Sequence, residues 1–448
     1  MKLDRLSVKN FKSIPAAGVS IDFRERFVAL VGKNNAGKSN IIEAVGMLFG
    51  SKNPRYLSFS RDVFHDPRLP LAIEAEFLEA SYGDGKAIGL SDPQCHALTP
   101  KDKQGNPKPG HGRIMLKLEV PATDGSSASG GADDEEEDEA KQSFTITVAE
   151  KTEIKRNEDI RKAIVKHILV PPLRDEHEIL APSTWTAYGR MLRDILAESD
   201  EAAALTKMIA ETSAKMQEVL QKEADTLSAA AQCTAYVDEV AFRFTKDGNP
   251  TELLRNLSLA VTFAGRTDDI SAVGTGTQSA VIIGVLELCL RHKARRGVRL
   301  FVIEEPELFL HPHAQRYVAR LLRRIAQEEK SYVLITTHSP SVLADTDLLD
   351  VIRVDRDADG GTGCRRVPPE FPGLEKAERI LTSETCEMMF ADRVVLNRSS
   401  QLANWATCVL SCFCRPGHFQ SSFPIVGSYL VEGPSESKDR RINNWRYY

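Results

Sequence analysis

One octapeptide constrains the fold of this chain more than any other feature. Residues 32–39 read GKNNAGKS, which fits the pattern G-x-x-x-x-G-K-S without a mismatch. The apolar run FVALV before it predicts a buried strand, and NIIEAVGMLFG after it has apolar residues at helical spacing. Strand, glycine loop and helix in this order are the context in which the pattern binds phosphate. The sequence therefore predicts an α/β fold of the P-loop NTPase type.

The positions of this loop have predicted parts in holding a nucleotide. Backbone N–H groups close around phosphate oxygens, and the helix N-terminus adds positive potential. Lys38 is predicted to reach the β- and γ-phosphates and Ser39 to bind Mg²⁺, so ATP and Mg²⁺ are the expected cofactors. The predicted ATP-binding residues are Gly32, Lys33, Asn34, Asn35, Ala36, Gly37, Lys38, Ser39 and Asn40.

Two later strands end in residues that suit hydrolysis. The apolar strand VRLFVI runs into Glu304 and Glu305; by position we expect Glu304 to hold Mg²⁺ and Glu305 to act as general base. The strand VLITT runs into His338, whose neutral imidazole could contact the γ-phosphate or position the attacking water. Because ligands bind at the carboxyl ends of strands in α/β sheets, Glu305 and His338 are the predicted catalytic residues.

A second glycine-rich loop, GTGTQ, opens a predicted helix and can present N–H groups and a hydroxyl to an anion. One phosphate cradle is already present, so the second is predicted to cap the nucleotide of another subunit. A loop that needs glycine for its backbone angles is the alternative. The residues concerned are Gly274, Thr275, Gly276, Thr277 and Gln278.

The 448 residues suffice for two to four domains. The opening LDRLSVKNFKSI alternates and predicts an edge strand, and strand patterns recur between residues 70 and 150.

Residues 120–144 include DDEEEDE and are expected to be a disordered insertion, with an acidic interaction tail as the alternative. Outside this run the chain is close to neutral, which says little about nucleic acid. The eight cysteines show no zinc-ligand spacing.

Alternating strands and helices predict a split ATPase domain. Its parts are residues 1–172 and 237–372, and the helical stretch 173–236 between them is predicted to be an arm or dimerisation insertion. Residues 373–448 form a separate C-terminal part. No apolar run approaches the length of a membrane span, so we expect no membrane contact and a cytoplasmic location, or a nuclear one in a eukaryote.

The order of loop, second glycine motif, carboxylates and histidine resembles the ATP-binding cassette, and the long separation between its halves resembles the cassettes of SMC and DNA-repair ATPases. Seven segments together resemble the overcoming-lysogenisation-defect (OLD) family of ATP-dependent endonucleases, over residues 1–396. These segments are LSVKNFKSI, VGKNNAGKSNIIEA, VPPLRD, GTGTQ, IEEPELFLHP, ITTHSPSVL and FADRVVL.

The resemblance implies several further properties. In that family the cassette dimerises with ATP between subunits, and a C-terminal Toprim domain cuts DNA with divalent metals. The family pattern implies that Lys12 lies near the nucleotide, Glu307 near the dimer seam and Arg174 at the start of the arm. Glu432 and Glu436 match acidic Toprim residues, a general base and a metal ligand.

The Toprim pattern is interrupted in this sequence. FADRVVL is followed by residues 397–428, which lack clear periodicity, before YLVEGPSE resumes the pattern. We expect an incomplete Toprim start, with 397–428 as inserted or misread coding sequence. A metal site of Cys408, Cys412, Cys414 and His418 is the alternative.

The sequence thus predicts ATP binding and hydrolysis by an OLD-type ATPase associated with DNA endonuclease activity, whose nuclease domain is incomplete. The expected partners are a second copy of the chain, in a dimer or larger homo-oligomer, and DNA. A nucleotide-gated clamp that binds DNA or recruits a separate nuclease or effector, without cutting, is the alternative. A degenerate product with no cellular activity is a third interpretation.

Overall fold

The structure is a computed structural model of the chain, and contacts divide it into two compact units. The first comprises residues 1–173 and 293–448, and the second comprises residues 174–292. The residues that the structure describes are 1–50, 52–99, 112–122, 142–149, 152–154, 158–170, 199–232, 260–263, 266–275, 297–308, 310–357 and 359–369, with short pieces within 189–196 and 277–284 and at 386, 395–396, 425–426 and 429–431.

A six-stranded sheet forms the centre of the first unit, in the order β14-β13-β3-β12-β11-β8. All neighbours are parallel except β14, which is antiparallel to β13. We call it the parallel sheet. Its strands are β3 (Phe27–Val31), β8 (Val165–Val170), β11 (Val298–Glu304), β12 (Ser331–Thr337), β13 (Val351–Arg356) and β14 (Thr362–Arg366).

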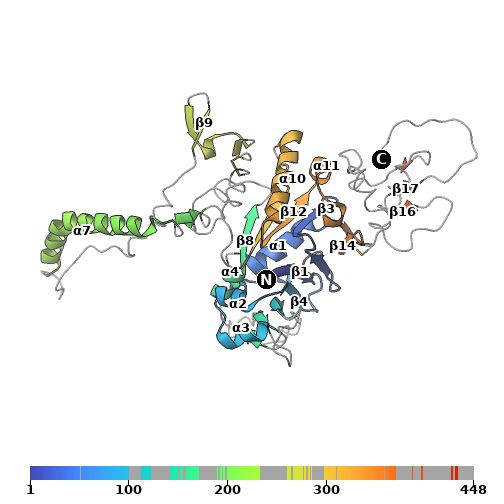
Figure 1. Ribbon diagram of the computed structural model, residues 1–448, viewed down its shortest axis with the longest axis horizontal. Coiled ribbons are helices and arrows are strands. Elements are labelled where there is room, and N and C mark those ends of the chain that lie inside the picture. The colour runs from blue at the N-terminus through green and yellow to red at the C-terminus, as the bar shows by residue number, and fades with distance from the viewer. Residues whose placement is uncertain are drawn as a thin grey trace, which may run out of the picture. The chain divides into compact units, whose positions relative to one another are not determined.

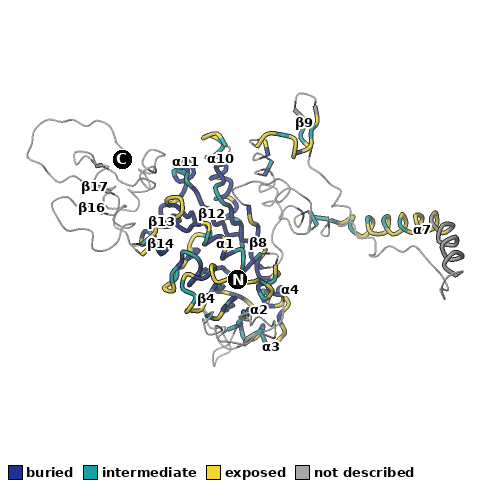
Figure 2. Tube along the Cα trace, turned by 180° about the vertical axis from the view of Figure 1, so that it is seen from behind, coloured by how far each residue is buried: buried dark blue, intermediate teal, exposed yellow. Residues whose placement is uncertain are grey.

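The continuous apolar runs that predicted buried strands form the middle of this sheet. Every residue of β3 and β12 is buried, as expected for strands covered on both faces. The tube in Figure 2 shows this buried centre. Helix α10 (Pro312–Gln327) packs against β12 through its apolar stripe, and α11 (Pro340–Leu343) lies beside α10 (Figure 1). The α/β class predicted from the sequence is confirmed.

A second six-stranded sheet is antiparallel, in the order β2-β1-β4-β5-β6-β7. Buried and half-buried residues alternate along β4 and β5, so one face packs on the core. Helix α1 (Lys38–Phe49) contacts strands of both sheets. The strands are β1 (Lys2–Lys9), β2 (Val19–Asp22), β4 (Leu71–Leu78), β5 (Ile114–Val120), β6 (Ser143–Val148) and β7 (Thr152–Ile154).

Two expectations about this region were wrong or incomplete. β1 is not an edge strand, because it pairs with β2 on one side and β4 on the other. Two short helices, α2 (Tyr82–Ala87) and α3 (Asp92–Leu98), interrupt the predicted strands. Each begins with a capping box, at Ser81 and Ser91, and this sequence signal could have located both. Helix α4 (Glu158–Ile164) leads directly into β8.

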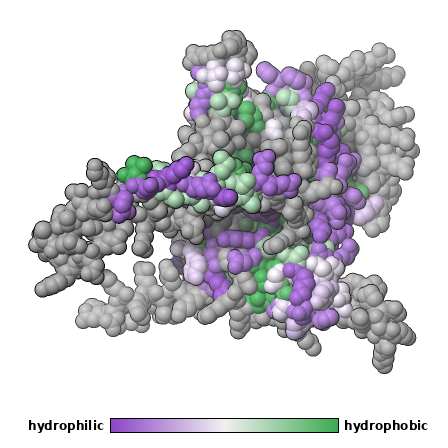
Figure 3. Space-filling view, turned by 60° about the vertical axis from the view of Figure 1, so that its left-hand side comes forward, coloured by the Kyte–Doolittle hydropathy of each residue, from purple (hydrophilic) through white to green (hydrophobic). Residues whose placement is uncertain are grey.

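The second unit contains a long helix, α7 (Ala202–Gln232), which confirms that part of the predicted helical stretch. It also contains the hairpin β9 (Ala260–Phe263) and β10 (Arg266–Asp269). Helix α7 exposes Met208, Met216 and Val219 among charged side chains. Hydrophilic and hydrophobic residues are interspersed on the face that Figure 3 shows. The predicted arm boundaries stay a prediction. No helix in the described part of the chain has the length and apolar character that a membrane crossing requires.

Three short strands near the C-terminus pair in the order β15-β17-β16. β15 (Val395–Leu396) belongs to FADRVVL and β17 (Tyr429–Val431) to YLVEGPSE, and the two are parallel; β16 is Ile425–Val426. Glu432, Glu436, Arg174, the three cysteines with His418, and most of the acidic insertion lie outside the described residues. The incomplete Toprim domain therefore stays a prediction.

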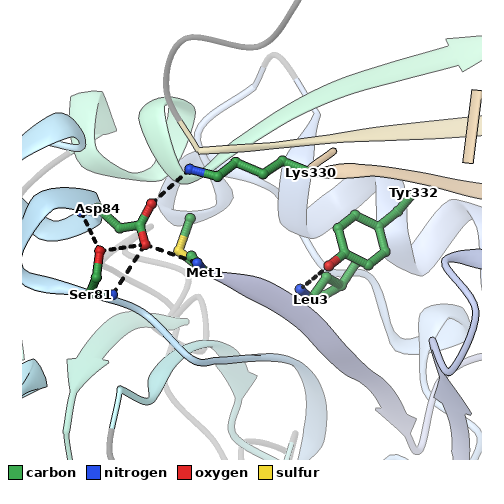
Figure 4. Close-up of polar contacts among 6 residues, drawn as sticks. All are labelled: Met1, Leu3, Ser81, Asp84, Lys330 and Tyr332. Atoms are coloured by element: carbon green, nitrogen blue, oxygen red, sulfur yellow. Dashed lines mark hydrogen bonds and ion pairs between the residues drawn. The ribbon is translucent and has the colours of Figure 1, made fainter. Parts of the chain in front are cut away.

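Asp84 joins the antiparallel sheet to the parallel one (Figure 4). Its carboxylate accepts hydrogen bonds from Lys330 Nζ at 2.8 Å, the Met1 amino group at 2.9 Å and Ser81 Oγ at 2.8 Å. Nearby, the Leu3 N–H of β1 donates to the Tyr332 hydroxyl of β12 at 3.0 Å. These contacts connect the start of β1 and the cap of α2 with the start of β12.

We expect Asp84→Asn to lower the stability of the first unit by about 2 kcal/mol at pH 7, the usual range for hydrogen bonds to a charged group. Burial alone would raise the pKa of Asp84, but hydrogen bonds from Lys330, the amino group and Ser81 lower it well below its usual range. A carboxyl whose pKa is depressed on folding stabilises the fold above its unfolded pKa, and this contribution is lost as the pH falls below about 4.

Urea unfolding of the wild type and Asp84→Asn between pH 7 and pH 3 measures the effect. The gap between the two proteins should shrink towards low pH. Asp92→Asn is the control, because Asp92 pairs with Lys86 while largely exposed. A gap that is absent at pH 7, or unchanged at pH 3, would contradict the prediction.

Candidate functional site

The loop between β3 and α1 has the backbone that its glycines predict. Gly32 has a φ of 150° and Gly37 a φ of 106°, values that side chains rarely allow. A Cβ atom at Gly32 would lie 2.0 Å from the Val354 carbonyl oxygen, and one at Gly37 would lie 2.1 Å from Thr362 Oγ1. Both glycines are therefore required, because the β13–β14 hairpin packs directly against the loop.

Lys38 is folded back over its own loop. Its Nζ donates to the carbonyl oxygens of Gly32 at 2.9 Å and Lys33 at 2.8 Å, and the residue is only 6% exposed. Burial lowers the pKa of Lys38 to about 8, although Glu305 and Glu307 oppose this shift. Within the part of the chain that the structure describes, the hydrogen-bond partners of this buried ammonium are carbonyl oxygens, so it is suited to an anionic ligand.

Ser39 and Glu304 join the loop to the end of β11. Ser39 Oγ donates to Glu304 Oε2 at 3.1 Å. Burial raises the pKa of Glu304, while the hydrogen bond from Ser39 opposes the shift. A hydroxyl and a carboxylate oxygen this close could both ligate one Mg²⁺ ion, since Mg²⁺ prefers oxygen ligands. The residues present therefore fit the metal that the sequence predicts.

Glu305 and His338 lie at the ends of neighbouring strands. Glu305 has a φ of 45°, uncommon outside glycine, and its N–H donates to the Thr336 carbonyl oxygen at 3.0 Å. His338 Nε2 is 3.8 Å from Glu305 Oε1. Burial, and then the charge of Lys38, lower the pKa of His338, with Glu305 opposing. The shift favours the neutral imidazole, the form that its predicted role uses.

These side chains surround a cavity of about 290 Å³ in the first unit. Lys38, Ser39, Glu305 and His338 all contribute to its wall, so residues that are far apart in the sequence share one pocket. Four of the predicted site residues, Gly32, Lys33, Ala36 and Glu304, are not among those that line it. The lining residues are Asn34, Asn35, Gly37, Lys38, Ser39, Asn40, Glu305, Thr336, His338 and Arg356.

Lys12 does not line this cavity. Its Nζ pairs with Glu43 Oε2 at 2.5 Å, on the second turn of α1. The following residue, Ser13, accepts a hydrogen bond from Asn40 Nδ2 at 2.6 Å, which ties this segment to the beginning of the helix. Contact of Lys12 with the nucleotide stays a prediction.

The second glycine motif lies in the second unit. Gly274, Thr275 and Thr277 are exposed, and Gly276 is outside the described residues. Gln278 is buried, and its Nε2 donates to the carbonyl oxygens of Ile270 and Val273. Gly274 has no positive φ, and a Cβ atom there would meet open space. The backbone therefore does not require glycine at 274, which leaves that position free for a binding role.

Sequence reasoning did not identify the intrachain role of Glu307. Its Oε1 accepts from Thr337 Oγ1 at 2.9 Å and from the His338 N–H at 2.6 Å. Oε2 is buried and has no hydrogen-bond partner among the described residues. Burial raises the pKa of Glu307. Glu307 therefore supports the loop that carries His338, and its place near a dimer seam stays a prediction.

Sequence reasoning also missed the β13–β14 hairpin. Thr362 Oγ1 donates to the Ala36 carbonyl oxygen at 3.0 Å, and the Thr362 N–H donates to the Ser13 carbonyl oxygen at 2.7 Å. Arg356, at the end of β13, lines the cavity. The only sequence signal was a Gly- and Asp-rich turn after an apolar strand.

Known proteins resemble this chain in its ATPase part. The family model described as the AAA ATPase domain matches residues 1–88 and 124–343. An OLD nuclease of Thermus scotoductus is 28% identical over 371 residues, covering 79% of this chain and 62% of that protein. The Old nuclease of Escherichia phage P2 is 25% identical over 431 residues, covering 88% and 67% respectively. The chain thus spans less than two thirds of the Thermus relative.

Among solved structures, an Smc head bound to the C-winged helix domain of ScpA has a TM-score of 0.49 and 17% identity, covering 85% of this chain and all of that one. The two nuclease relatives confirm the resemblance to the OLD family. The family model includes all the predicted catalytic residues and ends before Arg356.

Proposed function

This chain belongs to the AAA ATPase domain family, and we propose that it hydrolyses ATP in the cavity between the residue 32–39 loop and the ends of β11 and β12. The observation that carries the proposal is the convergence of Lys38, Ser39, Glu305 and His338 on one cavity. In this proposal the loop backbone and Lys38 hold the β- and γ-phosphates. Mg²⁺, held by Ser39 and Glu304, would neutralise charge on the phosphate oxygens.

Glu305 is the proposed general base. A water oxygen bonds to the γ-phosphorus, the bond from that phosphorus to the bridging β-oxygen breaks, and the water's proton passes to the Glu305 carboxylate. ADP and phosphate are the products. Neutral His338, 3.8 Å from Glu305, can hydrogen-bond the water or the γ-phosphate and so hold the reactants in line.

We further propose that residues 274–278 of a second copy complete the site. The exposure of Gly274, Thr275 and Thr277, and the absence of a backbone need for glycine at 274, support an external ligand for this loop. The names of the two relatives support a role beside DNA cleavage in the whole protein. In this proposal, Glu432 and Glu436 take part in the Toprim chemistry that cleaves the DNA. The alternative is that the protein does not cut DNA itself and gates a separate nuclease or effector.

Mixing two inactive variants tests the shared site. Glu305→Gln disables the base, and Gly274→Arg fills the open space of the second glycine motif. In a mixed dimer, one site combines the intact base of one copy with the intact motif of the other. An equal mixture should therefore regain about a quarter of wild-type phosphate release with ATP and Mg²⁺, assuming random pairing.

No recovery in the mixture, with both variants folded and the wild type active, would sink the shared site and leave each pocket self-sufficient or differently assembled. A wild-type chain that releases no phosphate from ATP would sink the hydrolysis proposal itself. Plasmid nicking in the same reactions, with Mg²⁺ or Mn²⁺, distinguishes a cutting protein from a clamp that does not cut.

A further inference from the structure

Arg356 lies where it can reach a bound nucleotide. It is the last residue of β13, which runs parallel to β3, with Arg353 opposite Val31. The carboxyl end of β13 therefore lies beside the loop that follows β3. Arg356 Nε donates to the Asn35 carbonyl oxygen at 2.6 Å, and Nη1 lies 3.5 Å from the Gly360 carbonyl oxygen. The guanidinium is fixed over the loop and contributes to the cavity wall.

The hairpin that carries Arg356 is attached firmly to the loop. The Asp357 N–H donates to the Gly361 carbonyl oxygen at 2.7 Å, and Asp357 Oδ1 accepts from the Gly361 N–H at 2.6 Å. Thr362 then binds Ala36 and Ser13, as described above. Because the turn is closed and anchored, the backbone that carries Arg356 is held beside the loop, and the hydrogen bond to Asn35 then holds the side chain.

The hydrogen-bond partners of Arg356 leave its charge available. Both are backbone carbonyl oxygens, and no carboxylate forms an ion pair with it in the described part of the chain. The residue is exposed, and its Nη2 makes no hydrogen bond within that part. A guanidinium with free N–H donors binds phosphate oxygens well, often through two parallel hydrogen bonds. An exposed cation fixed at the edge of a phosphate-binding loop is therefore suited to a polyphosphate.

We propose that Arg356 binds the phosphates of the nucleotide held by its own subunit, as a second cation beside Lys38, and favours triphosphates over nucleotides with fewer phosphates. This inference rests on the proposed ATP site. It assigns a role to a residue that neither the sequence patterns nor the matched family segment includes. Lys38 approaches from inside the loop and Arg356 from its rim, so the two cations would meet different oxygens.

Calorimetric titration with ATP, ADP and AMP in the presence of Mg²⁺ tests the inference. All proteins carry Glu305→Gln, so that ATP is not consumed. Arg356→Gln should weaken ATP binding about 10-fold, the effect of losing one charge-assisted hydrogen bond, and ADP binding less. Arg356→Lys should restore part of the affinity. Arg365→Gln is the control, because Arg365 lies on β14 of the same hairpin, pairs with Asp355 and does not line the cavity.

Each other outcome has a definite meaning. Unchanged ATP affinity in Arg356→Gln would overturn the inference. An equal loss for all three nucleotides, together with a lower melting temperature, would also overturn it, because it would indicate a structural role for the hairpin. If the Glu305→Gln protein with Arg356 intact binds none of the nucleotides, the proposed function fails. This result would be known before any Arg356 variant is compared.

Discussion

Glu305→Gln is expected to slow ATP hydrolysis by about 10³-fold, within the range measured for general bases. The amide of glutamine keeps the shape of the side chain but cannot accept the water's proton. ATP binding should remain within a few-fold of wild type, because the proposed phosphate contacts come from the loop and Lys38. Removing a carboxylate near the phosphates can even tighten binding, since like charges repel.

Single-turnover phosphate release, with ATP affinity measured in parallel, separates these effects. Glu329→Gln is the matched control: it makes the same chemical change at an exposed residue before β12, at the opposite end of that strand from His338. Hydrolysis by Glu305→Gln at the wild-type rate would refute the assignment of the base. A loss of ATP affinity as large as the loss of turnover would instead indicate that Glu305 stabilises bound ATP and does not act only in the chemical step.

The pH dependence of ATP turnover tests the role of His338, which lies beside Glu305. Burial and Lys38 lower the pKa of His338, so its neutral form is already dominant at neutral pH. A group whose pKa is lowered loses its proton earlier as the pH rises. Any contribution of neutral His338 should therefore reach its full size at a lower pH than it would for a histidine with an ordinary pKa.

The central part of this site could be predicted because its signals are local. Residues 27–49 hold an apolar strand, a glycine pattern and an amphipathic helix in succession, and the structure has β3, the loop and α1 there. Glu305 and His338 each follow a buried strand with an apolar run at its centre, LFVI in β11 and VLI in β12. The rule that parallel strands share a carboxyl edge then brings them together without knowledge of any contact.

The missed features depend on contacts that no local pattern records. Arg356 reaches Asn35 only because β13 pairs with β3, more than 300 residues away in the sequence. The error at β1 has a similar origin: alternation predicts one buried face, but cannot tell whether a strand has one neighbour or two. The burial of Glu307 likewise follows from the packing of β11 against β12.

Lys38→Met is expected to lower ATP affinity by about 100-fold or more, since hydrogen bonds between charged partners contribute about 1.5–3 kcal/mol each. Methionine has a similar length and is apolar, so the side chain can occupy the same buried space without the ammonium. Lys52→Met, an exposed change beyond the far end of α1, is the control.

The pH dependence of ATP binding adds a sharper test, because it follows from the burial of Lys38. Its pKa of about 8 means that the amine loses its charge as the pH rises through 8. Phosphate binding favours the charged form, so ATP affinity should be nearly constant from pH 7 to 7.5. Above pH 8 it should fall, by up to about tenfold per pH unit. The same titration with Lys38→Arg should be flat over this range, since a guanidinium keeps its charge. A wild-type affinity that stays constant up to pH 9.5 would contradict the prediction. It would mean that the Lys38 ammonium, with its lowered pKa, does not bind the phosphates.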